Sequence, residues 1–167
     1  MQTKGLPGEP KFLGVRHVAL LAKDAPGLAV FYREVMGMRV VRQTPADHPL
    51  GAITFLALDP EEEDHDVVLV PQGTMVHTAF RVVSLADLLA FYRRLKERGI
   101  PVKQCVNHIV EFAVYFEDPE KNLIEVYWVT GLSTADTYAE PINFELTEAQ
   151  LHLKVEHLAA KSGARRL

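Results

Sequence analysis

The chain has 167 residues, of which 48% are hydrophobic and 24% are charged, and its net charge is −4. This length is enough for one domain with a substantial core, and the composition is that of an ordinary globular protein. The charges form no basic stripe, which argues against a nucleic-acid partner, and no apolar run of about eighteen residues predicts a membrane span. Cys105 is the only cysteine, and the N-terminal stretch lacks the apolar region of a signal peptide. These features favour a cytoplasmic protein without internal disulfides.

A repeat with an offset of sixty residues organises most of the chain. Thirteen residues separate His17 from a Phe-Tyr-Arg tripeptide at 31–33, and the same number separates His77 from a second Phe-Tyr-Arg at 91–93. Since internal repeats of this kind mark repeated structural units, we expect two copies of one module.

The first copy predicts a strand, a helix and three further strands. Residues 16–22 form a short apolar run typical of a strand. The helix that follows is expected to begin after Asp24 as its N-cap and to stop at Gly37. Its apolar face is expected to consist of Leu28, Phe31, Tyr32 and Val35. The later strands are expected at 38–43, 52–58 and 66–71.

The second copy predicts the same order of elements. A strand over 76–82 precedes a helix that Ser84 caps and Gly99 ends. The apolar face of this helix consists of Leu85, Leu88, Leu89, Tyr92 and Leu95. Strands are then expected at 101–106, 111–117 and 123–129. We expect the repeated Phe-Tyr pairs of both helices to lie in the core.

Residues 131–167 fall outside the repeat. Thr147 and Gln150 form a capping-box pattern, which predicts a helix over 147–161, and the last five residues are expected to fray. The predicted fold class is therefore α+β. A single domain over 1–167 would contain one βαβββ module at about 12–72, a second at about 73–130, and a C-terminal extension.

Four residues at equivalent positions of the repeat are candidates for chemistry. His17 and His77 are sixty residues apart, and so are His65 and Glu125. Burying Glu125 within its apolar strand is costly unless the carboxylate is paired or coordinated, although alternation also allows it to face solvent. Two His and one carboxylate form the facial triad of non-haem Fe(II) sites, while Zn, Ni and Mn are not excluded. The alternative is that each His is an ordinary core or surface side chain.

Three segments resemble the vicinal oxygen chelate superfamily: HVALLAKD from His17, HTAFRV from His77, and VYFEDPEKNLIEVYW near the end of the second copy. The resemblance covers about residues 12–130, and it implies two tandem βαβββ modules that form a curved mixed sheet around a metal site. Within this superfamily, the chain is most similar to the single-domain type I extradiol dioxygenases. Many of these carry the pattern DHG-x4-VYFxDPDGN, which NHIVEFAVYFEDPEKN follows here, with Lys121 in place of the usual glycine of the turn.

The resemblance implies roles for individual residues. The metal ligands that it implies are His17, His77 and Glu125. His65, twelve residues before His77, corresponds to the acid–base histidine of the family. His108 and Tyr115 correspond to groups that hydrogen-bond the substrate, although the spacing between them varies in the family.

The implied activity is Fe(II)-dependent cleavage of a catechol-like aromatic diol with O2, as in aromatic compound catabolism. The expected partners are this small molecule and O2, without nucleic acid or membrane, and a homo-oligomer is compatible with open sheet edges. One alternative is a glyoxalase-, epimerase- or thiol-transferase-type metalloenzyme of the same superfamily, in which His65 would be a fourth ligand. A second alternative is a noncatalytic module that binds small molecules.

Overall fold

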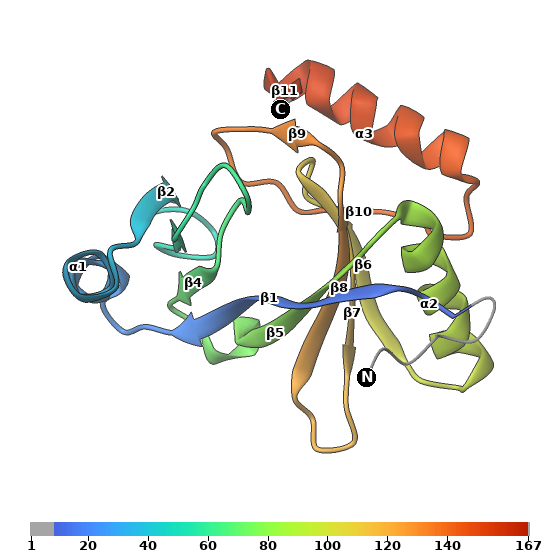
Figure 1. Cartoon of the computed structure of the whole chain (residues 1–167), viewed down its shortest axis with the longest axis horizontal. Coiled ribbons are helices and arrows are strands. Elements are labelled where there is room, and N and C mark those ends of the chain that lie inside the picture. Colours follow the sequence, from blue (N-terminus) through green and yellow to red (C-terminus); the bar gives the residue numbers. More distant parts are fainter. Residues whose placement is uncertain (1–8, 167) are drawn as a thin grey trace. The chain divides into compact units, whose positions relative to one another are not determined.

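The computed structural model describes residues 9–166. The first eight residues, which contributed to the expectation about a signal peptide, and Leu167 lie outside the described residues. The fold is α+β with a mixed sheet and a C-terminal helix, which confirms the predicted class (Figure 1). The chain divides into two compact units. The smaller unit is Val15–Ala79, and the larger unit contains the described residues up to Gly14 and from Phe80 onward.

The smaller unit contains one helix and a mixed sheet. Its elements are most of β1 (Phe12–Leu21), α1 (Ala25–Met36), β2 (Arg39–Gln43), β3 (Thr54–Ala57) and β4 (Val67–Val70). The strands are ordered β1-β4-β3-β2, with β1 and β4 parallel and the other two pairs antiparallel. The predicted strand, helix and three strands of the first copy are therefore present.

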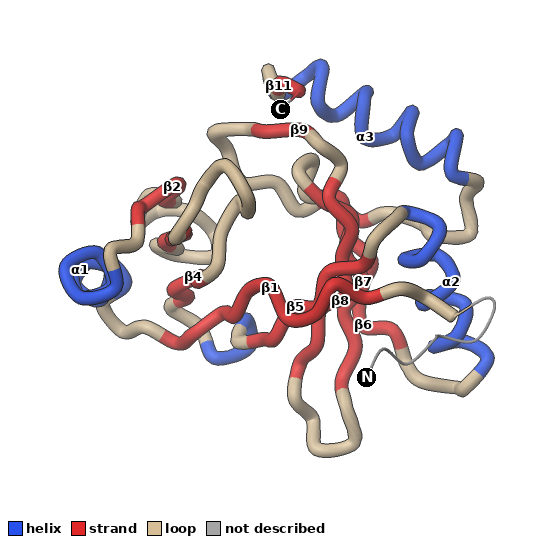
Figure 2. The backbone as a smooth tube through the Cα atoms, in the orientation of Figure 1, coloured by secondary structure: helices blue, strands red, loops and turns tan. Residues whose placement is uncertain are grey.

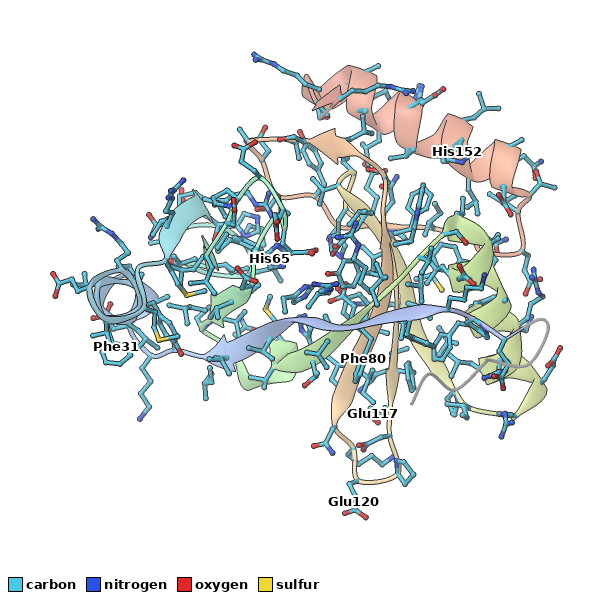
Figure 3. All side chains as sticks on the ribbon, viewed as in Figure 1. Phe31, His65, Phe80, Glu117, Glu120 and His152 are labelled. Carbon is cyan, nitrogen blue, oxygen red and sulfur yellow. The ribbon has the colours of Figure 1, made fainter. Side chains whose placement is uncertain are left out.

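Helix α1 has the predicted ends but a different buried face. The Asp24 carboxylate accepts a hydrogen bond from the Gly27 N–H at 3.0 Å, and Gly37 ends the helix at a φ of +71°. The buried side chains are Ala25 and Ala29, whereas Phe31 is 52% exposed (labelled in Figure 3). Leu28 and Tyr32 of the predicted face do pack against the core, but the expectation that Phe31 lies in the core is wrong, and Val35 of that face is exposed as well. Phe31 follows Ala29 by two residues, which places it on the opposite side of a helix.

The larger unit is built around β6, β7 and β8, which pair antiparallel with one another in chain order. Its elements include β5 (His77–Val82, which begins in the smaller unit), α2 (Leu85–Glu97), β6 (Val102–Asn107), β7 (Glu111–Glu117) and β8 (Leu123–Val129). The strand order here is β10-β6-β7-β8-β5, where β10 is Glu140–Pro141. Strands β7 and β8 form a long hairpin, which Figure 2 shows in red.

Helix α2 packs on one face of this hairpin. Ser84 caps it by accepting a hydrogen bond from the Asp87 N–H at 3.1 Å, and four of its leucines are buried, as predicted. These leucines share a core with Phe112, Val114 and Val126. Because side chains alternate along a strand, Tyr115 on β7 and Glu125 on β8 are turned toward the other face.

Helix α3 (Glu148–Ser162) begins with the predicted capping box of Thr147 and Gln150. The expected fraying of the tail is wrong as far as Arg166, because β11 (Arg165–Arg166) pairs with β9 (Leu132–Ser133). Gly163, at a φ of +69°, turns the chain back toward that pairing. None of the described helices, α3 included, is long and apolar enough to cross a membrane.

The turn between β7 and β8 contains a strained backbone position. Asp118 accepts hydrogen bonds from the N–H groups of Glu120 and Asn122, and Lys121 has a φ of +69°. A side chain in this left-handed region costs about 1–2 kcal/mol, whereas glycine adopts it freely.

We therefore expect Lys121→Gly to raise the free energy of unfolding by roughly 1 kcal/mol. Glu120→Gly is the matched control in the same turn (Glu120 is labelled in Figure 3). Its φ is not positive, so this change is expected to destabilise the protein. Urea denaturation of both variants measures the difference. A Lys121→Gly protein less stable than the wild type would contradict the argument from strain.

Candidate active site

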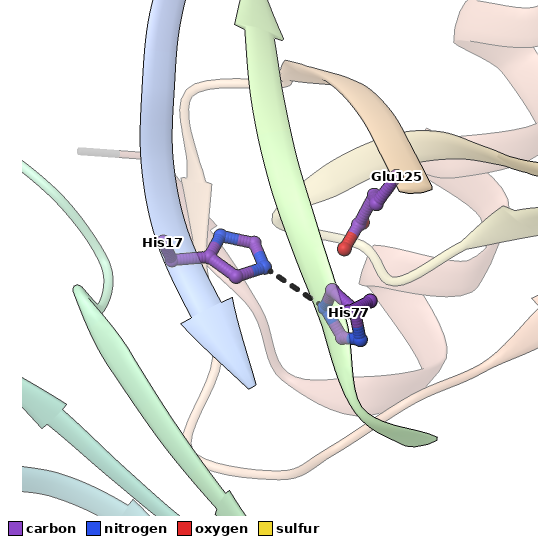
Figure 4. Close-up of side chains that lie close together, drawn as sticks. All are labelled: His17, His77 and Glu125. Carbon is purple, nitrogen blue, oxygen red and sulfur yellow. Dashed lines mark hydrogen bonds between the residues drawn. The ribbon is translucent and has the colours of Figure 1, made fainter. Parts of the chain in front are cut away.

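Two predicted metal ligands lie side by side in the smaller unit. Their Nε2 atoms are 3.2 Å apart, as the dashed line in Figure 4 marks, with His17 on β1 and His77 on β5. The Nδ1–H of His77 donates to the Met75 carbonyl at 2.8 Å, so Nε2 of the neutral ring carries a lone pair. Two cis nitrogens bound to one metal at about 2.1 Å would be about 3 Å apart. The pair therefore has the spacing of a chelating pair, and His77 has the tautomer of a ligand.

His65 joins this pair within the smaller unit (labelled in Figure 3). It is only 6% exposed, and its ring lies 4.3 Å from that of His17 between centroids. Burial and the neighbouring His17 lower the pKa of His65 to about 4, against the opposing effect of Asp64. His65 is therefore neutral at neutral pH and has the form of a base.

Sequence reasoning missed the side chains behind His65. Asp64, the fourth residue of the acidic run EEEDHD (61–66), hydrogen-bonds the His65 ring at 2.7 Å. Arg42 on β2 in turn binds Asp64. The adjacency of Asp64 and His65 was the available signal, whereas nothing in the sequence relates Arg42 to them.

The larger unit brings together the other three predicted residues. Glu125 is 1% exposed and stands opposite Tyr115 in the β7–β8 register. The Tyr115 hydroxyl lies 3.2 Å from His108 Nε2, and the Nδ1–H of His108 donates to the Tyr138 carbonyl. In the neutral ring, Nε2 is therefore the acceptor that faces Tyr115.

Glu111 is a buried carboxylate that sequence reasoning did not single out. One ligand atom each of His108, Glu111 and Glu125 lies within 4.8 Å of the others. On β7, Glu111 precedes Tyr115 by four residues, so alternation places it on the same face of the strand. This face of the larger unit thus carries two carboxylates beside an imidazole and a phenol.

The turn that carries His108 is held in a strained conformation. Ile109 has a φ of +70°, in the left-handed region that favours glycine. Its N–H donates to the Asn107 side chain at 2.8 Å, and its carbonyl accepts from the Thr130 hydroxyl at 2.6 Å. A strained backbone persists only where surrounding contacts hold it. Here these two hydrogen bonds hold the backbone next to His108.

Burial and the carboxylates of Glu125 and Glu111 raise the pKa of Tyr115 well above its ordinary value. The phenol thus stays protonated and acts as a hydrogen-bond donor. Because the folded-state pKa is raised, the associated stability is present below about pH 10 and is lost as the pH rises further.

We therefore expect Tyr115→Phe to leave the tyrosinate absorbance of the metal-free protein unchanged between about pH 9 and pH 11, where ordinary tyrosines ionise. The wild-type protein, titrated at the same concentration, is the reference. A full loss of one titrating tyrosine in the Tyr115→Phe protein would contradict the raised pKa.

Comparison with known proteins identifies the family of the chain. Residues 14–126 match the family model of the Glyoxalase/Bleomycin resistance protein/Dioxygenase superfamily. Biphenyl-2,3-diol 1,2-dioxygenase 3 of Rhodococcus globerulus is 32% identical over 122 residues, which are 66% of this chain and 60% of that relative. Biphenyl-2,3-diol 1,2-dioxygenase 2 of the same organism is 33% identical over 138 residues, which are 76% of this chain and 66% of the relative. The matches thus span less than two thirds of the length of either relative.

Solved structures share the fold. A catechol 2,3-dioxygenase matches with a TM-score of 0.58 and 19% identity, over 80% of this chain and 45% of its own. The Mn(II)-bound glyoxalase of Novosphingobium aromaticivorans matches with a TM-score of 0.61 and 19% identity, over 87% of this chain and 44% of its own. At these identities the likeness concerns the fold alone. On the match over residues 14–126, the chain belongs to the Glyoxalase/Bleomycin resistance protein/Dioxygenase superfamily.

Proposed function

We propose that the chain is an extradiol-type dioxygenase that cleaves a catechol-like aromatic diol with O2. The observation that carries the proposal is the pair of His17 and His77 Nε2 atoms at 3.2 Å, with His77 fixed by the Met75 carbonyl. The two relatives named as biphenyl-2,3-diol 1,2-dioxygenases support this choice of substrate class.

The proposed metal ligands are His17, His77 and Glu125, which offer two imidazole nitrogens and one carboxylate oxygen. This donor set is that of a facial triad, which suits Fe(II). The buried Glu125 is also the carboxylate for which a bound cation would offset the cost of burial. Bound Fe(II) would supply a template for the diol and O2 and would be a redox partner in the reaction.

The remaining predicted residues have proton-handling roles in this proposal. His65 is neutral and has its Nδ1–H tied to Asp64, so its Nε2 is the atom that would accept a hydroxyl proton of the diol. Tyr115 is a protonated donor that would hydrogen-bond a substrate oxygen as charge develops there. In the metal-free protein this hydroxyl donates to His108 Nε2, so the role requires its single proton to turn from His108 toward the substrate oxygen.

The experiment is an oxygen-uptake assay with anaerobically purified, Fe(II)-loaded protein. We expect catechol or biphenyl-2,3-diol to consume one O2 per diol and to yield a ring-opened product that carries both atoms of labelled O2. His77→Ala should abolish uptake and metal retention. His157→Ala, at an exposed position of α3, should change neither. Absence of uptake together with tight binding of Zn, Ni or Mn would refute the proposal.

A second prediction separates an acid–base role for His65 from a ligand role. His65→Asn should lower kcat by about 10²- to 10⁴-fold, the usual range for a lost general base, while the iron content stays unchanged. Iron analysis and steady-state kinetics of the same preparation measure both quantities. Loss of the metal would instead make His65 a fourth ligand.

A glyoxalase-type metalloenzyme is the second candidate. The match to a Mn(II)-bound glyoxalase supports it, and so does Glu111, an additional carboxylate beside His108 and Glu125. This candidate needs no O2, so activity that persists under anaerobic conditions would select it.

A further inference from the structure

A β-bulge on β2 determines where the Arg42 side chain lies. Along the β2–β3 pairing, Val40 stands opposite Leu56 and Arg42 stands opposite Phe55, so β2 contains one additional residue between them. Bulges redirect side chains, and Arg42 lies with its guanidinium 4.3 Å from the centre of the Phe55 ring. Its side chain is only 9% exposed. The cation is therefore held away from water and has a fixed orientation.

The buried guanidinium binds Asp64 through two nitrogens. Arg42 Nη2 is 3.0 Å from Asp64 Oδ2, and Nη1 is 3.4 Å from Oδ1. Such forked pairs fix the plane of a carboxylate as well as its charge. Burial alone would raise the pKa of Asp64, but the hydrogen bond to His65 and the Arg42 charge hold it well below its ordinary value. Asp64 is thus an ionised carboxylate of defined orientation.

Asp64 Oδ2, which accepts the hydrogen bond from Arg42 Nη2, also lies 2.7 Å from His65 Nδ1. An ionised carboxylate only accepts hydrogen bonds, so Nδ1 of His65 carries the proton and Nε2 of the neutral ring does not. The ring is also confined by the edge of Phe55, at 5.2 Å between centroids, and by His17. The contacts with Asp64, Phe55 and His17 therefore fix the orientation of the His65 ring, and the Asp64 carboxylate fixes its tautomer.

We propose that Arg42 and Asp64 are positioning residues that hold His65 in the Nδ1–H tautomer, with Nε2 directed to act as the base. The inference rests on the proposed function for its catalytic consequence, but the tautomer itself is a property of the metal-free protein. A carboxylate behind a catalytic or ligating histidine commonly has this effect, and its removal commonly costs about 10- to 100-fold in activity. Neither residue touches the substrate in this arrangement, because Asp64 acts through His65 and Arg42 acts through Asp64.

Nitrogen-15 NMR of the full, metal-free chain tests the tautomer without any activity. The ring signals of His65 are assigned by their loss in His65→Asn. We expect a protonated Nδ1 and an unprotonated Nε2 in the wild type, and a shift toward the Nε2–H form in Asp64→Ala. Asp59→Ala, an exposed residue of the same loop, is the matched control and should leave the signals unchanged. An unchanged His65 tautomer in Asp64→Ala would overturn the proposal.

A double-mutant cycle tests the catalytic consequence. Asp64→Ala should lower kcat by about 10- to 100-fold with KM and iron content unchanged, and Asp64→Ala combined with His65→Asn should be no slower than His65→Asn alone. If the double variant instead showed the sum of the two single losses in log kcat, Asp64 would have a role unrelated to His65, and the proposal would be overturned.

Arg42→Gln provides a second route, in which Asp64 and His65 both remain. It should shift the tautomer in the same direction as Asp64→Ala, whereas Arg39→Gln, on the exposed side of the same strand, should not. If the wild type itself consumes no O2, the proposed function fails, and the NMR result still decides the tautomer.

Discussion

The alternation of side chains along β7 and β8 is the constraint on which the larger unit depends. One face of the hairpin supplies Phe112, Val114 and Val126 to a core that α2 covers. Because that face must be buried in the core, Tyr115 and Glu125 are turned to the opposite face, in register with each other. A shift of one residue in either strand would exchange the faces, so the core packing also fixes which groups are available for chemistry.

His65, His77 and His108 share one arrangement, in which Nδ1 of each ring donates a hydrogen bond to an oxygen acceptor. The Nδ1 of His77 faces the Met75 carbonyl, that of His108 faces the Tyr138 carbonyl, and that of His65 faces the Asp64 carboxylate. In each neutral ring Nδ1 carries the proton and donates a hydrogen bond to the acceptor, which leaves Nε2 as the nitrogen with a lone pair. A backbone carbonyl cannot be lost by substitution, whereas the Asp64 carboxylate can, which makes His65 the most adjustable of the three.

The repeat of sixty residues was sufficient to predict the strands, both helix N-caps and the grouping of His17 with His77. The capping box of α3, outside the repeat, was predicted from Thr147 and Gln150 alone, because cap signals are local. The face of α1 was predicted incorrectly, since large apolar residues were weighted above the small Ala25 and Ala29 that allow close packing. Arg42 could not be predicted, because its place depends on a bulge and on a pairing between segments over twenty residues apart. Strands β9, β10 and β11 have two residues each, too few for any periodic pattern.

The strained turn at Ile109 also links the site to the C-terminal extension. Ile109 is fully buried and packs with Leu158 and Ala159 of α3. Burial of such a side chain contributes about 1.5–3 kcal/mol, which offsets the roughly 1–2 kcal/mol that its left-handed backbone costs. An isoleucine at this position is thus tolerable only while a helix is present to cover it. The conformation of the turn beside His108 therefore depends on a helix that lies outside the repeat.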